Sequence, residues 1–173
     1  MINAILSIDL GNKGGLSIVP IMQHKLDRPN TKVISLEDKN YIIKTNDLIK
    51  DYTIMYVFIE EPLVHKFKPV WAIASNCEDY GWWKCYCSLK GLPTPIPIKI
   101  SKWKGYFKLK IKGNKKATKE DGLNILLNLG YSKQLFNRYG VTGKVLSGFQ
   151  DGVCDSLLIG ECGFNLYTSL FIQ

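Results

Sequence analysis

The chain has 173 residues, 46% hydrophobic and 22% charged, which suits one domain with a packed core and excludes global disorder. Lys and Arg number 23 against 15 Asp and Glu, and the resulting charge of +8 favours an anionic partner. No apolar run reaches the ~20 residues of a membrane span, and the N-terminus lacks the basic segment of a signal peptide. Five cysteines without a CxxC pair, beside two histidines, argue against a zinc site. We therefore expect a soluble, cytoplasmic protein whose residues 1–173 form a single domain.

The N-terminal part is predicted to be rich in strands. Apolar runs at 4–8 and 16–19, joined by a glycine-rich connection, predict a β-hairpin. A loop is expected over 20–32, and further strands over 33–36 and 41–43. The run 54–59 is continuous, aromatic and β-branched, as in a strand buried on both faces, and it ends at Glu60.

The remainder alternates helices with one strand. Helical spacing, with no proline after Pro69, predicts a helix over 69–90, stopped by Gly91. A strand is expected over 94–98, and helices over 115–129 and about 150–163. This order predicts an α/β fold with one central sheet and no second domain.

A basic stretch runs from Lys84 to Lys119, with eleven lysines and no acidic residue. Trp103, Tyr106 and Phe107 lie among these lysines. Such a run is often only a solvated surface, but lysines with interspersed aromatics also suit a nucleic-acid backbone and its bases. On the second interpretation, the lysines expected to bind DNA are Lys102, Lys104, Lys108, Lys110, Lys112, Lys115 and Lys116.

Four carboxylates are candidates for catalysis. Asp9 and Glu60 each end a predicted strand, where an acid taken singly can be a plain boundary residue. Asp151 and Asp155 are four residues apart on one face of the last helix, and that face continues through apolar residues. Because like charges held close together need a counter-charge, a divalent cation is the simplest solution. Four such acids could hold two ions and hydrolyse a phosphodiester bond.

Short motifs around these acids resemble those of the RuvC-type Holliday junction resolvases. Ile8-Asp9-Leu10-Gly11 looks like the first acidic motif, Val57-Phe58-Ile59-Glu60 the second, and the segment 151–160 the terminal one. Gly81-Trp82-Trp83 and the segment 98–104 are similar in order and spacing to the phage-encoded subgroup. Residues 113–120 resemble the lysine-rich start of the family's next helix, so the resemblance covers roughly 4–163.

The resemblance implies a ribonuclease H-like fold of the retroviral integrase type, with a mixed five-stranded sheet flanked by helices. It also implies a homodimer in which the 69–90 helix supplies much of the interface, and two Mg²⁺ ions, replaceable by Mn²⁺, in each active site. The expected activity is that of a crossover junction endodeoxyribonuclease acting on four-way or other branched DNA, with no membrane and no nucleotide cofactor. The residues that match the acidic tetrad are Asp9, Glu60, Asp151 and Asp155. Lys119 matches a lysine near the scissile phosphate, and Lys115 or Lys116 could replace it.

Three features depart from the family pattern. The last two acids are four residues apart instead of three. Glu61 adjoins Glu60, and of these two we prefer Glu60 as the metal ligand. Leu63 stands where cellular members place an aromatic residue after the second acid. Phe67 or His65 could take over its role of prising bases apart.

Other functions stay open on the sequence alone. The same tetrad would serve a ribonuclease H-type hydrolase of RNA–DNA hybrids. The protein could also have this fold and bind junctions without catalysing their cleavage. The segment 9–15 also looks like the phosphate loop of actin-like ATPases, although those proteins need two such lobes.

Overall fold

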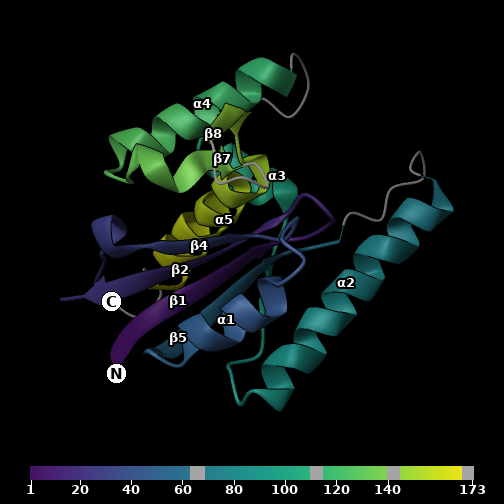
Figure 1. Ribbon diagram of the computed structural model, residues 1–173, viewed down its shortest axis with the longest axis vertical. Coiled ribbons are helices and arrows are strands. Elements are labelled where there is room, and N and C mark those ends of the chain that lie inside the picture. Colours follow the sequence, from purple (N-terminus) through teal and green to yellow (C-terminus); the bar gives the residue numbers. More distant parts are fainter. Residues whose placement is uncertain (63–68, 110–114, 140–144, 169–173) are drawn as a thin grey trace.

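The computed structural model describes residues 1–62, 69–109, 115–139 and 145–168. A central mixed sheet carries helices on both faces (Figure 1). Its strands are β1 (Ile2–Asp9), β2 (Gly15–Met22), β3 (Lys25–Leu26), β4 (Lys32–Ser35), β5 (Tyr52–Glu60) and β6 (Ile96–Ile98). They follow the order β3-β2-β1-β5-β6, with β4 also paired to β2.

Strand β1 lies in the middle of this sheet. It pairs antiparallel with β2 and parallel with β5, and β5 pairs parallel with β6. Since β1 occupies one edge of β2, both β3 and β4 must lie along the other edge, one after the other. The short 3₁₀ helix η1 (Arg28–Asn30) separates them in the chain, so together they act as one interrupted edge strand.

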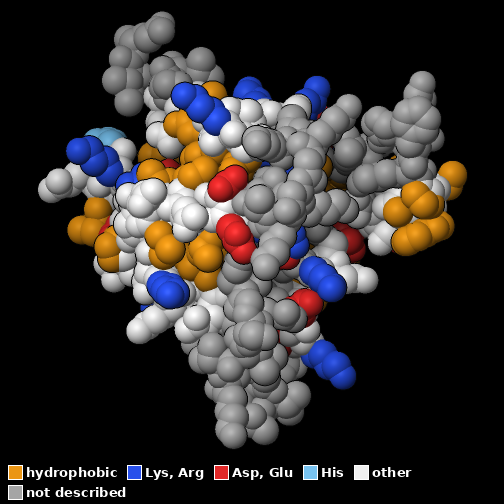
Figure 2. All heavy atoms as spheres, turned by 90° about the horizontal axis from the view of Figure 1, so that it is seen from above, with side chains coloured by type: hydrophobic (Ala, Val, Ile, Leu, Met, Phe, Trp, Pro, Cys, Tyr) orange, Lys and Arg blue, Asp and Glu red, His pale blue; other side chains and the backbone are white. Residues whose placement is uncertain are grey.

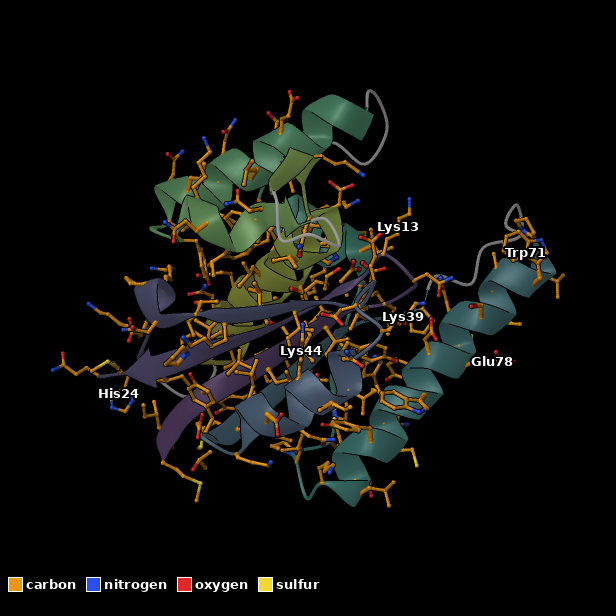
Figure 3. All side chains as sticks on the ribbon, viewed as in Figure 1. Lys13, His24, Lys39, Lys44, Trp71 and Glu78 are labelled. Atoms are coloured by element: carbon orange, nitrogen blue, oxygen red, sulfur yellow. The ribbon has the colours of Figure 1, made fainter. Side chains whose placement is uncertain are left out.

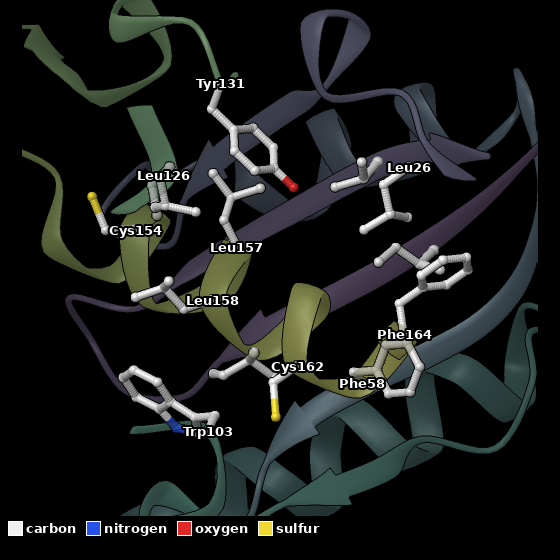
Figure 4. Close-up of a cluster of buried hydrophobic side chains, with 14 of the residues drawn as sticks. Leu26, Phe58, Trp103, Leu126, Tyr131, Cys154, Leu157, Leu158, Cys162 and Phe164 are labelled. Atoms are coloured by element: carbon white, nitrogen blue, oxygen red, sulfur yellow. The ribbon is translucent and has the colours of Figure 1, made fainter. Parts of the chain in front are cut away.

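Alternating side chains of β1 and β5 divide the core between the two faces of the sheet. Ile5 and Phe58 belong to the cluster packed under α3 (Ile100–Tyr106), α4 (Lys115–Asn128) and α5 (Asp151–Thr168), part of which Figure 4 shows. Leu6 and Val57 belong to the opposite cluster, under α1 (Tyr41–Ile49) and α2 (Val70–Leu89). The sheet is therefore buried on both faces, as predicted for residues 54–59.

Helix α5 approaches the sheet closely because it carries glycine where it crosses the strands. A Cβ atom at Gly160 would collide with the side chain of Ser7 on β1, and one at Gly163 with the ring of Phe58 on β5. Residues 152–154 and 156–164 are all buried. This close packing places the N-terminal end of α5 beside the carboxyl end of β1.

The predicted mixed α/β fold, with a central sheet flanked by helices, is confirmed. The helices expected over 69–90, 115–129 and 150–163 correspond to α2, α4 and α5. Within the described residues, no helix is both long and apolar enough to cross a membrane.

Two local predictions were wrong, and three elements were not predicted. Residues 41–43 begin α1 instead of a strand, because Tyr41, Leu48 and Ile49 recur at helical spacing and pack on the sheet. The expected loop over 20–32 contains the end of β2, β3 and η1. Helix α3 and the hairpin of β7 (Asn137–Tyr139) and β8 (Val145–Phe149) were not predicted. The elements β3, η1, α3, β7 and β8 are each at most seven residues long, too short to show a clear period.

Candidate active site

Asp9 and Glu60 end neighbouring parallel strands on the same face of the sheet. The β1–β5 register pairs Ile8 with Ile59, so the two acids follow at one edge. Side chains two or four residues apart in a strand lie on the same face of the sheet, so Asp9 shares the face of Ile5 and Glu60 that of Phe58. Ile5 and Phe58 both pack in the cluster under α5. Glu61 has the opposite alternation and raises the pKa of Tyr80 on α2. The geometry therefore places Glu60, not Glu61, beside Asp9.

The N-terminal end of α5 is seated against the β1–β2 connection through glycine backbones. Gly14 forms an isolated parallel bridge with Gly152. A Cβ atom at Gly152 would collide with the carbonyl oxygen of Lys13 and the backbone of Gly14. One at Gly15 would collide with the backbone of Gly152. This contact fixes the first turn of α5, with Asp151 and Asp155, next to the end of β1.

Asp9 and Asp155 form the partly buried centre of the site. Burial raises the pKa of Asp9 well above its usual value, and the charges of Asp155 and Glu60 raise it further. Burial also raises the pKa of Asp155 to about 6. Both shifts have the direction expected of carboxylates removed from water and held near other negative charges. The site thus concentrates negative charge that the protein neutralises only in part.

Lys104 supplies part of that neutralisation. Its charge lowers the pKa of both Asp9 and Asp155, against the effect of burial. Lys104 lies on α3, with its Nζ atom 5.0 Å from the centre of the Trp103 ring, and Trp103 itself is buried in the core. Packing of Trp103 thereby anchors the helix that presents Lys104 to the two acids.

Asp151 and Lys119 lie at the rim of the site. The Nζ atom of Lys119, on α4, donates a hydrogen bond to Oδ2 of Asp151. The Lys119 side chain is 49% exposed and the Asp151 side chain 38%, whereas loss of water is the largest influence on the pKa of Asp155. Lys119 also lowers the pKa of Asp155. An ion pair this exposed can open at little cost and exchange partners with an incoming anion.

The structure brings part of the predicted DNA-binding set to this edge of the molecule. Lys102 and Lys108 are exposed, on α3 and just after it, and the backbones of Lys115 and Lys116 begin α4. Lys110, Lys112 and Phe67, with His65, lie outside the described residues. On the face seen in Figure 2, acidic side chains lie among lysines and arginines.

Two features of the site were missed in the sequence. Lys104 was predicted only as one of several DNA-binding lysines, and its place beside Asp9 and Asp155 follows from α3, which was not predicted. The close contact at Gly152 joins residues distant in sequence, and the only signal for it was glycine in the segment 11–15 and again at 152. Within the described residues, no three His, Cys, Asp or Glu side chains converge into a ready-made metal cage.

Comparison with solved structures identifies the fold. The sequence matches no protein-family model and no curated protein. The structure of Thermus thermophilus RuvC in complex with a Holliday junction substrate is similar, with a TM-score of 0.56, 13% identity and 96% of each chain covered. A second Thermus thermophilus RuvC structure gives a TM-score of 0.54 at 14% identity, covering 98% of this chain and 97% of that one. The chain thus has a ribonuclease H-like fold. More narrowly, its arrangement of strands and helices is RuvC-like over nearly its whole length.

Proposed function

We propose that this protein is a metal-dependent endonuclease that cuts branched DNA, in particular four-way junctions, by hydrolysing phosphodiester bonds. The observation that carries the proposal is the partly buried pair Asp9 and Asp155, whose pKa values are raised by loss of water, with Lys104 acting on both acids and Lys119 on Asp155. The RuvC-like fold over nearly the whole chain supports the choice of substrate, because one of the similar structures holds a Holliday junction.

The acids fit a hard divalent cation such as Mg²⁺ or Mn²⁺. Mg²⁺ is commonly held by one or two carboxylates together with waters and substrate phosphates, so a complete protein cage is not required. Asp9 and Asp155, with Glu60 beside them, supply oxygen ligands and a charge that a cation would stabilise. Two ions bound there, with Asp151 as a further ligand at the rim, would polarise the scissile phosphate and favour ionisation of the attacking water.

The basic residues would position the DNA. Lys119 can exchange Asp151 for a phosphate oxygen, because the pair is half exposed at the mouth of the site. Lys102 and Lys108, with the lysines of 110–116, would contact the backbone beyond it. Such contacts set orientation and affinity, but they do not select a base sequence.

A homodimer would present two active sites to the two symmetric strands of a junction. Helix α2 offers exposed apolar side chains for it, Val70 and Trp71 at its first turn and Leu89 at its end. We place such a protein in the cytoplasm, where its DNA substrate would lie.

The test is cleavage of an immobile four-way junction, labelled on each strand, with Mg²⁺ or with a chelator. Linear duplex and an RNA–DNA hybrid are assayed beside it. We expect Mg²⁺-dependent, symmetric cuts near the crossover. Asp155→Asn should bind the junction but cut it at least about 100-fold more slowly. The matched control is Asp47→Asn, which neutralises an exposed carboxylate paired with Lys50 on α1. Undiminished cutting by Asp155→Asn would refute the proposed site, and cutting of the hybrid alone would assign a ribonuclease H-type activity.

A further inference from the structure

A second site of distinct chemistry lies on the other face of the sheet. A cavity of about 320 Å³ opens between the loop after β1, the start of α1 and the middle of α2. Its walls include Tyr41, Trp82 and Trp83, with the carboxylates of Glu78 and Asp79. Figure 3 labels Glu78 on α2. Gly11 and Asn12, in the loop that follows Asp9, also line the cavity. Its aromatic wall belongs to the side of the sheet under α1 and α2, since Trp83 is part of that core cluster, whereas Asp9 and Glu60 face α5.

The aromatic rings form a rigid corner. The ring planes of Trp82 and Trp83 are 85° apart, with centroids 4.9 Å apart, and those of Tyr41 and Trp82 are 70° apart, with centroids 6.4 Å apart. Tyr86 stacks on Trp82 at 5.4 Å, and the Tyr86 hydroxyl donates a hydrogen bond to Asn46. Trp82 nevertheless stays 42% exposed. The rings are therefore fixed before any ligand arrives, with one of them open to solvent.

The charge of the cavity is negative although the chain as a whole is basic. Among the described residues that line it, two are acidic and none is Lys or Arg. Burial and the neighbouring charge of Glu78 raise the pKa of Asp79, and Asp79 in turn raises the pKa of Tyr41. Aromatic faces attract cations through their quadrupole, most strongly in Trp, and carboxylates add a direct charge. A phosphate or another anion would be repelled here.

We propose that this cavity binds a small organic cation with protonated amines, a diamine or polyamine, between the aromatic rings and the carboxylates of Glu78 and Asp79. The volume lies at the lower end of small-molecule pockets. The net charge of +8 would repel a basic protein partner as a whole, whereas a small cation needs only the local field. This proposal does not depend on the nuclease activity, since it concerns the chain without DNA.

The test is isothermal titration calorimetry of the full chain with spermidine and with putrescine at physiological salt. We expect saturable binding with one site per chain. Trp82→Leu and the double variant Glu78→Gln/Asp79→Asn should each weaken it at least tenfold, and Trp82→Phe should weaken it less than Trp82→Leu. The matched control is Glu120→Gln, an exposed carboxylate on α4 across the sheet, which should bind as the wild type does.

Several results would overturn the proposal. Full affinity in Trp82→Leu, or displacement of spermidine by an equal concentration of Mg²⁺, would show simple charge attraction. Binding of a lysine-containing peptide without binding of either amine would assign the cavity to a protein partner. Thermal unfolding of each variant checks its folding, and the carboxylate variant alone decides the matter if Trp82→Leu does not fold. Junction cleavage is measured separately, so failure here leaves the nuclease proposal standing.

Discussion

The charge on Asp155 raises the pKa of Asp9 across the interface between α5 and β1. These residues are distant in sequence and meet because the glycine contact at Gly152 brings the start of α5 against the end of β1. Two carboxylates buried in this way oppose folding when both are ionised. Their stabilisation by a cation is therefore measurable without any DNA.

The first prediction concerns stability and pH without divalent cations. Burial raises the folded-state pKa of Asp155 from 3.8 to about 6 and that of Asp9 in the same direction, so the folded chain binds more protons than the unfolded chain. The contribution of this pair to stability should thus fall as the pH rises from about 4 to above 6, by roughly 3 kcal/mol for Asp155 alone. Chemical unfolding at pH 5 and pH 8 measures it. At pH 8, Asp155→Asn should be more stable than the wild type. A wild-type protein whose stability relative to Asp155→Asn rises between pH 5 and pH 8 would contradict this prediction.

The second prediction concerns metal binding. Mg²⁺ should raise the melting temperature of the wild type at pH 8, because it binds the folded site and relieves the repulsion between the acids. The gain should be about 2.7 kcal/mol at a concentration of 100 times Kd. Thermal unfolding with Mg²⁺ and with a chelator measures it, and Asp47→Asn is the control. An equal Mg²⁺ effect in Asp155→Asn would place the ion elsewhere.

The third prediction separates Lys104 from its neighbour Lys102. Lys104 lowers the pKa of Asp9 and Asp155, so Lys104→Met should raise both values and increase the loss of stability between pH 5 and pH 8. Lys102→Met removes the same charge from an exposed position on α3 and should leave that pH dependence unchanged. Unfolding experiments at the two pH values compare the variants. Identical pH profiles for the two would mean that Lys104 does not act on the acid pair.

The fourth prediction concerns the glycine contact. Gly152→Ala would drive a Cβ atom into backbone atoms of Lys13 and Gly14, which cannot move aside as a flexible side chain can. We expect the free energy of unfolding to fall by several kcal/mol. In any variant protein that still folds, Asp151 and Asp155 should be displaced and cleavage lost. The control is Gly81→Ala on α2, where a Cβ atom would meet nothing and helix propensity should add about 0.5–1 kcal/mol of stability. Denaturant unfolding and junction cleavage test both, and a neutral Gly152→Ala would refute the contact.

The sequence predicted those parts of the fold that have a long or strong pattern. The hydrophobic pattern predicted the buried strand that ends at Glu60 and the helices α2, α4 and α5. The prediction of α5 placed Asp151 and Asp155 on one face of that helix. The sequence could not show that Asp155 lies beside Asp9 while Asp151 pairs with Lys119 at the rim, because both acids obey the same helical spacing. That difference arises from tertiary packing of α4 and α5. The cavity beside Trp82 likewise depends on α1, which the short apolar run at 41–43 had suggested to be a strand.

The last prediction concerns a part-buried ion pair that ties η1 to α5. Arg28 Nε donates to Oε1 of Glu161 at 2.5 Å, and the Tyr131 hydroxyl donates to the same oxygen at 2.9 Å. Glu161 is only 1% exposed, so Arg28→Met would leave its charge in the core without a counter-charge, at a cost of about 3–5 kcal/mol. Arg28→Met/Glu161→Gln removes that charge and should recover most of the loss. As a control, Lys44→Met breaks the exposed pair with Asp38 and should cost less than about 1 kcal/mol. Denaturant unfolding ranks the variants, and an Arg28→Met as mild as Lys44→Met would show that the charge of Glu161 needs no partner.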